Sequence, residues 1–393
     1  MIILEIVFWL FVFIVIYAYL GYGVLLYFLV KLKETFAKRK ITVDSANFEP
    51  EVTLFVAAFN EKDFVDIKLQ NSFSLDYPQE KVRQLWVTDG SDDGTPDILR
   101  TYKGIEVYHQ PERAGKIAAM NRGMEFVKTP IVIFSDGNTL LGKESIRRIV
   151  KLFSDPKVGC VSGEKRIFSK DSTAATEGIY WKYESKLKQW DARLYSVVGA
   201  AGELFALRTE LFEPVERDTL LDDFIVSLRI AEKGFTIQYD PNAYAIENPS
   251  ANVREELKRK IRISAGGIQS VIRLKELLNP FKFGILSFQY ISHRVLRWTL
   301  APLGLPIILL CNLAISLSIG IFDFSNIYNW LLWFQIVFYA IALFGWYLEE
   351  KHIKVKIFYV PYYFFIMNLA VYLGFIRYMK KSQSVNWERA KRG

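Results

Sequence analysis

Residues 52–61, with the sequence VTLFVAAFNE, contain the pattern from which we predict the fold of the central part of this chain. The near-continuous run of apolar residues is typical of a strand that is buried on both faces. Shorter strand-like runs follow at residues 85–88, 105–108, 131–135 and 158–162, with helical stretches between them at 63–73, 97–102 and 116–126. Strands that alternate with helices predict a mostly parallel α/β sheet with helices on both of its faces.

Polar clusters follow several of these strands, at the carboxyl ends where sheets of this kind bind ligands. The clusters are Asn60-Glu61, DGSDDGT at 89–95, RAGK at 113–116 and DGN at 136–138. Taken singly, each cluster also suits a turn or a helix cap. Taken together, they predict a site for a nucleotide diphosphate, whose negative charge requires a divalent cation, backbone donors or cationic side chains.

The residue types in these clusters suggest how such a molecule would be bound. Asp136 and Asn138 offer the oxygen ligands that Mg2+ or Mn2+ prefers. Lys116 and Arg113 could neutralise phosphate groups. Asp89 and Glu61 could hold the base or the ribose.

Three later segments extend the predicted site. Residues 198–208 (VGAAGELFALR) are rich in glycine and suit either the close approach of a ligand or a bulged strand. Asp222 and Asp223 begin a predicted helix, where they could favour the helix dipole or supply a general base to an acceptor hydroxyl. Within residues 255–267, three basic residues share a helical face that could be solvated, contact anionic lipid or bind a leaving diphosphate. They are Lys258, Arg259 and Arg262.

Four long apolar runs predict membrane spans. Residues 6–30 carry no charge, and further runs follow at 298–322, 324–348 and 357–376. Basic residues directly after the first run place the next segment in the cytoplasm by the positive-inside rule. Residues 281–297 mix apolar and basic side chains, as in a helix that lies in the membrane surface or one that packs on a domain. The two cysteines have no CxxC partner and fit a reducing cytosolic face.

The predicted organisation is a transmembrane helix at 1–30, a basic linker at 31–50, a cytosolic catalytic domain at 51–280, an interfacial helix at 281–297, about three transmembrane helices at 298–379 and a basic tail at 380–393. One span before the domain and three after it would place the tail outside, whereas the positive-inside rule prefers it inside. Either the last run does not cross fully or the number of spans differs. The net charge of +8 reflects basic segments beside the spans, and no basic and aromatic stripe indicates nucleic-acid binding.

In this order, the motifs resemble those of the family 2 glycosyltransferases, in the membrane-embedded branch that includes cellulose, hyaluronan and poly-N-acetylglucosamine synthases. The resemblance implies a GT-A nucleotide-diphospho-sugar transferase domain inserted between transmembrane helices of the cell (inner) membrane. AAFNE resembles the first-strand motif and brings Ala57 and Phe59 to the nucleotide. TDGSDDGT resembles the second motif, with Asp89 as its nucleotide-binding carboxylate, and RAGKIAAMN resembles the donor loop that contains Lys116.

The resemblance also implies the metal and acceptor positions. SDGN stands in place of the DxD metal motif, with Asp136 retained and Asn138 in place of the second carboxylate. GAAGELFALR resembles the glycine-rich acceptor-side segment, which contributes Gly199, Gly202 and Glu203.

The catalytic base and the motif that follows it are implied in the same way. LDDF stands where the processive enzymes have TED, so Asp223 matches the base and Asp222 lies beside it. RKIRI stands in place of Q-x-x-R-W. Arg262 matches its arginine, Arg259 replaces its glutamine, and Ile263 replaces the tryptophan that stacks on the acceptor sugar.

The expected activity is therefore inverting transfer from a nucleotide-diphosphate sugar, with a UDP-sugar as the expected donor and a divalent cation, Mg2+ or Mn2+, as cofactor. The expected acceptor is a growing extracellular polysaccharide at the cytosolic membrane face, which the basic helix, the surface helix and the late spans favour, with export partner proteins left open; a lipid acceptor is the alternative. Ile263 and the small number of spans favour transfer of one residue to a lipid-linked or lipid acceptor. The alternative from another class is a non-catalytic membrane protein that binds a nucleotide sugar, and the Asp222–Asp223 pair argues against it because a sensor needs no base.

Overall fold

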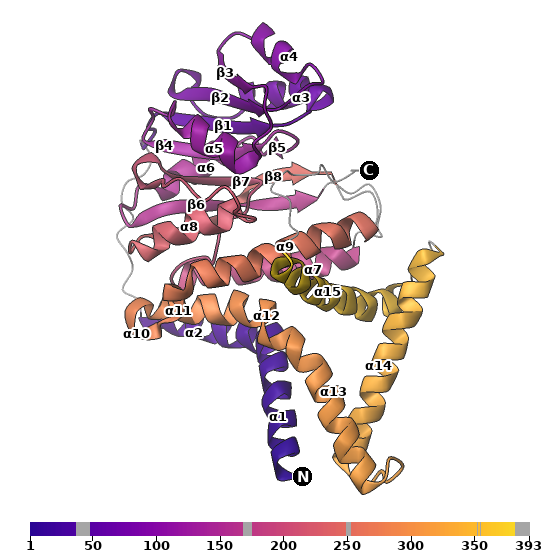
Figure 1. Ribbon diagram of the computed structural model, residues 1–393. Coiled ribbons are helices and arrows are strands. Elements are labelled where there is room, and N and C mark those ends of the chain that lie inside the picture. The colour runs from indigo at the N-terminus through magenta and orange to yellow at the C-terminus, as the bar shows by residue number, and fades with distance from the viewer. Residues whose placement is uncertain (37–47, 168–174, 249–252, 352, 354, 382–393) are drawn as a thin grey trace.

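The computed structural model describes residues 1–36, 48–167, 175–248, 253–351, 353 and 355–381. These residues form three levels: an α/β domain, a layer of helices beneath it, and long apolar helices that extend away from that layer (Figure 1). The predicted linker at 31–50 lies partly outside the described residues, and so does most of the predicted tail at 380–393.

The α/β domain is built on a sheet whose eight strands, within the described ranges, follow the order β3-β2-β1-β4-β7-β6-β8-β5. The strands are β1 (Val52–Ala58), β2 (Val82–Asp89), β3 (Ile105–Gln110), β4 (Ile131–Asp136), β5 (Leu140–Leu141), β6 (Val158–Ile167), β7 (Leu204–Arg208) and β8 (Thr236–Glu247). β7 runs antiparallel to β4 and β6, and β5 runs antiparallel to β8, while the other neighbouring pairs are parallel. The mostly parallel sheet that the sequence predicts is therefore confirmed.

Helices cover both faces of this sheet, as predicted. They are α3 (Lys62–Phe73), α4 (Thr95–Thr101), α5 (Lys116–Met124), α6 (Ser145–Leu152) and α8 (Asp222–Glu232). Phe55 and Val87 pack with α5 and α8 on one face, whereas Leu54 and Trp86 pack with α3, α4 and α6 on the other. Because successive strand residues point to opposite faces and both faces are buried, the strands are apolar almost throughout.

The layer beneath the domain consists of helices that lie along its underside (Figure 1). They are α7 (Ala175–Leu194), α9 (Val253–Arg273), α10 (Pro280–Phe283), α11 (Ile285–Tyr290), the π-helical turn η6 (Ile291–Val295) and α12 (Leu296–Trp298). The helix predicted at 281–297 is thus present but interrupted, because Gly284 adopts a φ of 52° between α10 and α11.

The N-terminal helix is bent instead of crossing as one straight rod. It consists of α1 (Ile2–Ile16), the π-helical turn η1 (Tyr17–Gly21) and α2 (Tyr22–Phe36). α1 extends away from the domain, whereas α2 turns and lies along the underside of α11 and α7 (Figure 1). A π-helical turn is a recognised cause of such a kink, and the Ala18 carbonyl within η1 accepts a hydrogen bond from Arg297 Nε at 2.9 Å.

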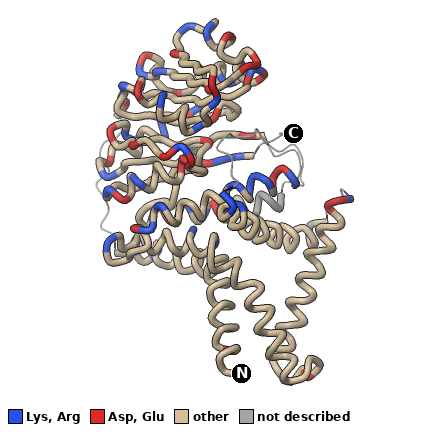
Figure 2. The backbone as a smooth tube through the Cα atoms, in the orientation of Figure 1, with Lys and Arg blue, Asp and Glu red and all other residues tan. Residues whose placement is uncertain are grey.

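The C-terminal apolar runs form α13 (Leu300–Ile319), α14 (Ile327–Glu350) and α15 (Lys356–Met379). Within the described residues, four helical segments are long and apolar enough to cross a membrane, counting Ile2–Phe36 as one. Figure 2 shows that α1, α13 and α14 carry almost no charged residues. α15, however, turns back from the end of α14 and runs across beneath α9 (Figure 1). The two helices are in close contact, since a Cβ atom on Gly374 of α15 would lie 2.8 Å from the Ala265 nitrogen of α9.

Candidate active site

Lys116 joins three parts of the predicted site. Its Nζ atom lies 2.8 Å from Asp136 Oδ1 at the end of β4, and 3.5 Å from Asp222 Oδ2 at the start of α8. Burial lowers the pKa of Lys116, but the neighbouring carboxylates of Asp136 and Asp222 outweigh this effect and raise the pKa overall. The Lys116 side chain is therefore positively charged, and it lies at the carboxyl edge of the sheet.

The loop before Lys116 is held by Asp89. Its Oδ2 atom accepts hydrogen bonds from the backbone nitrogens of Ala114, at 2.9 Å, and Gly115, at 2.6 Å. Its Oδ1 atom lies 3.5 Å from Arg122 Nη1. Asp89 thus holds the loop at 113–116, and it lies outside the large cavity that Lys116 lines.

A second group of predicted donor residues gathers at the end of β1. The guanidinium carbon of Arg113 lies 3.7 Å from the centre of the Phe59 ring, a stacked cation–π arrangement. Glu61 is buried, with its Cγ beside Gly137. Ala57 lines a small cavity that Lys116 and Asp136 also line.

The glycine-rich acceptor-side segment packs directly against the start of α8. A Cβ atom on Gly199 would lie 2.2 Å from the Phe224 ring, and one on Gly202 would lie 3.1 Å from Asp223 Oδ2. Gly199 also adopts a φ of 85°, which favours glycine. Because these two positions have no side chain, the segment at 199–202 can pack directly against Asp223 and Phe224. The Asp223 side chain lines the cavity beside Gly202.

Glu203 is paired, together with Glu247 of β8, to one lysine. Lys165 Nζ lies 2.5 Å from Glu203 Oε1 and also contacts Glu247 Oε2. Burial alone would raise the pKa of Glu203, but the charge of Lys165 holds it well below its usual value. The carboxylate of Glu203 is consequently charged and fixed, and it belongs to an ion network in the cavity wall.

The Asp136–Asn138 loop is supported from below by Lys68 of α3. Lys68 Nζ donates hydrogen bonds of 2.7 Å to Ser135 Oγ and to the Thr139 carbonyl. Burial lowers the pKa of Lys68 to about 7. This buried lysine fixes the two residues that flank the predicted metal ligands.

The residues of this loop fit a hard divalent cation. Asn138 Oδ1 is buried and has no hydrogen-bond partner within the described residues, and the Asp136 carboxylate lies in the same cavity wall. A buried amide oxygen without a partner is costly unless a ligand or ion satisfies it. The described residues contain no group of three or more His, Cys, Asp or Glu side chains that could hold a metal alone, so phosphate oxygens of a donor would have to complete the coordination.

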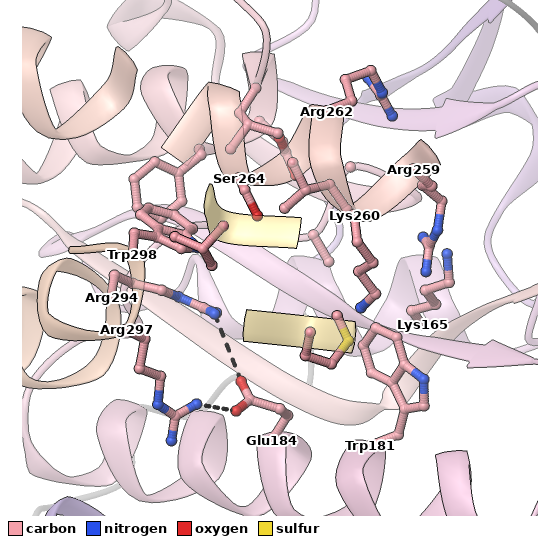
Figure 3. Close-up of a pocket in the computed structure, with 18 of the residues that line it drawn as sticks. Lys165, Trp181, Glu184, Arg259, Lys260, Arg262, Ser264, Arg294, Arg297 and Trp298 are labelled. Carbon is pink, nitrogen blue, oxygen red and sulfur yellow. Dashed lines mark hydrogen bonds and ion pairs between the residues drawn. The ribbon is translucent and has the colours of Figure 1, made fainter. Parts of the chain in front are cut away.

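The basic helix predicted at 255–267 is part of α9 and faces the cavity. Arg259 forms two hydrogen bonds of 3.0 Å with Glu256. Burial lowers the pKa of Arg262, while the charge of Asp222 opposes that shift. In Figure 3, Arg262 points away from the membrane-side residues, and Lys260 points toward Trp181 of α7.

Many of these groups line one cavity of about 1260 Å3. Of the predicted site residues, it contains Lys116, Asp136, Asn138, Gly202, Glu203, Asp222, Asp223, Arg259 and Arg262. Ala57, Phe59, Glu61, Asp89, Arg113 and Gly199 lie outside its lining. The cavity also extends downward to residues of η1, α12 and α15, which the motifs did not indicate.

Several residues of the site were missed by sequence reasoning. Lys68 and Lys165 are isolated lysines, one in a helix and one in a strand. For Lys68 a signal was present, because it lies on the buried face of α3 together with Val65 and Leu69. Arg294 and Arg297 were noted only as basic residues of a surface helix. Their partner Glu184 lies on α7, which carries no motif, and all three line the cavity.

The central part of the chain is similar to known glycosyltransferases. The family model described as "Glycosyltransferase like family 2" matches residues 50–266. Poly-beta-1,6-N-acetyl-D-glucosamine synthase of Staphylococcus aureus (strain MSSA476) is 25% identical over 234 residues, which are 56% of this chain and 56% of the synthase. A probable glycosyltransferase of Bacillus subtilis (strain 168), YdaM, is 26% identical over 249 residues, 59% of this chain and 58% of YdaM. The chain thus spans a little over half the length of these curated relatives.

One solved structure is similar over nearly the whole chain. The mannosyltransferase PcManGT from Pyrobaculum calidifontis, in complex with GDP-mannose and Mn2+, has a TM-score of 0.71 and 22% identity. The similarity covers 97% of this chain and 100% of that one, and at this identity it establishes the fold.

The sheet and its covering helices have the GT-A fold, and four helical segments of the described residues are candidate membrane spans. Because the family model matches more than half of the chain, the protein belongs to glycosyltransferase family 2.

The carboxylate at the cavity wall predicts a pH dependence. Burial, followed by the charge of Asp222, raises the pKa of Asp223 to about 7. The sequence predicts Asp223 as the general base, and a base acts only when it is deprotonated, so this prediction requires kcat/KM to rise about tenfold per pH unit below pH 7 and to level off above it. Initial rates from pH 5.5 to 9 at limiting donor test this. An Asp222→Asn variant should move the midpoint downward, and a profile that is flat across this range contradicts Asp223 as the base.

Proposed function

We propose that this protein transfers a sugar from a nucleotide-diphosphate donor to a hydroxyl of a lipid-linked acceptor at the cytosolic face of the membrane, with inversion at the anomeric carbon. The observation that carries this proposal is the cavity itself. One end contains Lys116, Asp136 and Asp223, and the other is lined by apolar residues of η1 and α15. A water-soluble donor and a membrane-held acceptor can therefore reach the same carboxylate from opposite ends.

Asp223 is assigned the role of base. Its carboxylate removes the proton from the acceptor hydroxyl while that oxygen forms a bond to the anomeric carbon of the donor. The bond between this carbon and the diphosphate oxygen breaks, and its electron pair stays on the diphosphate. Lys116 lies between Asp136 and Asp222, where its charge would stabilise the developing negative charge.

Asp136 and Asn138 are the residues that would hold a divalent cation, Mg2+ or Mn2+. Such an ion supplies Lewis-acid stabilisation to a leaving diphosphate. Arg262 of α9 lines the same cavity and is assigned to the donor side. A UDP-sugar is the donor we expect from the motifs, and a GDP-sugar is the competitor to be tested because PcManGT was solved with GDP-mannose.

We also propose three spans, formed by α1, α13 and α14, with α15 at the cytosolic surface. This count places the start of the tail, Lys380 and Lys381, on the same side as the catalytic domain. It satisfies the positive-inside rule, which one span before the domain and three after it do not. The supporting observation is that α15 runs across beneath α9 (Figure 1).

Polysaccharide synthesis is the second candidate, and similarity to a poly-N-acetylglucosamine synthase favours it. The two candidates differ in their product. With purified full-length protein and labelled donor, transfer to lipid gives a product of one added sugar that partitions into butanol, whereas polymer synthesis gives a ladder that stays in water. We expect the first result. Donor binding without transfer or hydrolysis would instead indicate a non-catalytic binding protein.

Replacement of the base should abolish transfer without loss of donor binding. We expect Asp223→Asn to lower kcat by about 10^2 to 10^4, and to leave the dissociation constant for the nucleotide within about threefold, because the substitution keeps the shape of the side chain. Stopped assays and nucleotide titration measure the two quantities. Turnover close to that of the unmodified protein refutes the assigned role.

Removal of divalent cations tests the metal ligands. Excess EDTA should lower turnover by about 10^2 or more, since Lewis-acid stabilisation is worth several kcal/mol, and added Mn2+ should restore it. Asn138→Asp adds the second carboxylate and should reduce the Mn2+ concentration needed for half-maximal rate. Equal turnover with and without chelator would contradict the assignment of Asp136 and Asn138 as metal ligands.

A further inference from the structure

The membrane-side half of the cavity contains more basic than acidic side chains within the described residues. Arg294 Nη1 lies 3.6 Å from Glu184 Oε2, and Arg297 Nη1 contacts Glu184 Oε1. Two guanidinium groups from η6 and α12 thus share a single carboxylate of α7, as Figure 3 shows. His293 Nε2 lies 3.3 Å from the same carboxylate, so the two oxygens of Glu184 are contacted by three side chains.

A second group of paired charges lies on α9. Glu256 of α9 pairs with Arg259 at 3.0 Å and lies 3.7 Å from Lys260 Nζ. Lys260 also lies 5.2 Å from the centre of the Trp181 ring and, in Figure 3, is on the side of α9 opposite to Arg262. Arg294 and Lys260 both line the cavity, and cationic side chains in such a place can donate charge-assisted hydrogen bonds to a bound anion.

This basic region lies between the catalytic base and the apolar end of the cavity. The Arg294 guanidinium is 6.0 Å from the Trp298 ring, and that ring lies 5.1 Å from Phe224, the residue after Asp223. On the other side, the lining continues into Val15, Ile16, Leu20, Val360 and Phe364. Ile16, Leu20 and Val360 are each more than half exposed on the apolar outer surface. The order along the cavity is therefore carboxylate, cations and hydrocarbon.

We infer that the acceptor is a lipid whose sugar is attached through a phosphate or diphosphate, and that Arg294 and Lys260 bind this anionic group. The inference rests on the proposed function, because it identifies the acceptor of the same site. The sugar hydroxyl would face Asp223, the phosphate would lie between η6 and α9, and the hydrocarbon chain would leave between η1 and α15. Arg262, turned to the other side of α9, remains with the donor.

The test measures binding of farnesyl phosphate to the full-length protein in detergent by calorimetry. Farnesol has the same chain without the charge, and inorganic phosphate has the charge without the chain. We expect farnesyl phosphate to bind at least about tenfold more tightly than either. Arg294→Gln and Lys260→Gln should each weaken farnesyl phosphate by about tenfold or more, the range for a charge-assisted hydrogen bond, while binding of farnesol and of the donor nucleotide stays unchanged.

Arg193→Gln is the matched control, since Arg193 also pairs with a single carboxylate, Glu34, at 2.5 Å but lies outside the cavity lining. It should not alter farnesyl phosphate binding. Equal affinities for farnesol and farnesyl phosphate overturn the inference, and so does unchanged affinity in both cavity variants. If inorganic phosphate binds as tightly as farnesyl phosphate, the site is an anion site without a lipid, and the inference is wrong.

The assay separates this inference from the proposed function, because binding of farnesyl phosphate does not require transfer. If the protein forms a butanol-soluble product but does not bind farnesyl phosphate, the proposed function is supported and the inference is wrong. A protein that binds farnesyl phosphate through Arg294 but makes no lipid product keeps the anionic site and loses the function.

Discussion

The ion cluster of Lys116 with Asp136 and Asp222 is the interaction on which the rest of the site depends. It connects the first residue of α5, the end of β4 and the start of α8. Because α8 begins at Asp222, the base candidate Asp223 lies at the edge of the sheet. Gly202 packs directly against its side chain. A cation between two carboxylates in a partly buried place is stable only if the geometry is held, and Asp89 and Lys68 hold the two loops from which it is built.

A second constraint comes from the junction between the domain and the membrane helices. Two π-helical turns, η1 and η6, face each other there, and Tyr17 of η1 bonds to Ser292 of η6 at 2.9 Å. Behind them, His293 Nδ1 lies 2.6 Å from Asp191 Oδ2, and Tyr22 also bonds to Asp191. Polar groups buried at this depth must be satisfied by one another. The bend in the N-terminal helix and the position of α7 are therefore coupled, and both shape the lower half of the cavity.

Most of the α/β domain could be predicted from the sequence because its signals are local. Buried parallel strands need continuous apolar runs, so β1, β3 and β4 were identified close to their observed bounds. β2 and β6 were also identified, but they extend beyond the predicted runs at 85–88 and 158–162. β7 and β8 were harder. β7 follows a glycine-rich stretch, and β8 contains Asp240, Pro241 and Asn242, residues more typical of turns. The candidate site was predicted only in part, since Asp89 supports a loop and six of the predicted residues lie outside the main cavity.

The sequence alone determined the alternation of strands and helices over residues 52–162, the apolar segments and the positions of the charged motifs, because each of these depends on neighbouring residues in the chain. Only the tertiary structure decided that Lys165 joins Glu203 to Glu247, that Glu184 serves two arginines, and that α15 lies under α9. These ion pairs join residues that are 38 to 113 positions apart in the chain. The two helices are in contact at Gly374 of α15. Hydrophobic periodicity contains no information on which distant segments meet, since that choice is set by packing and by the need to pair buried charges.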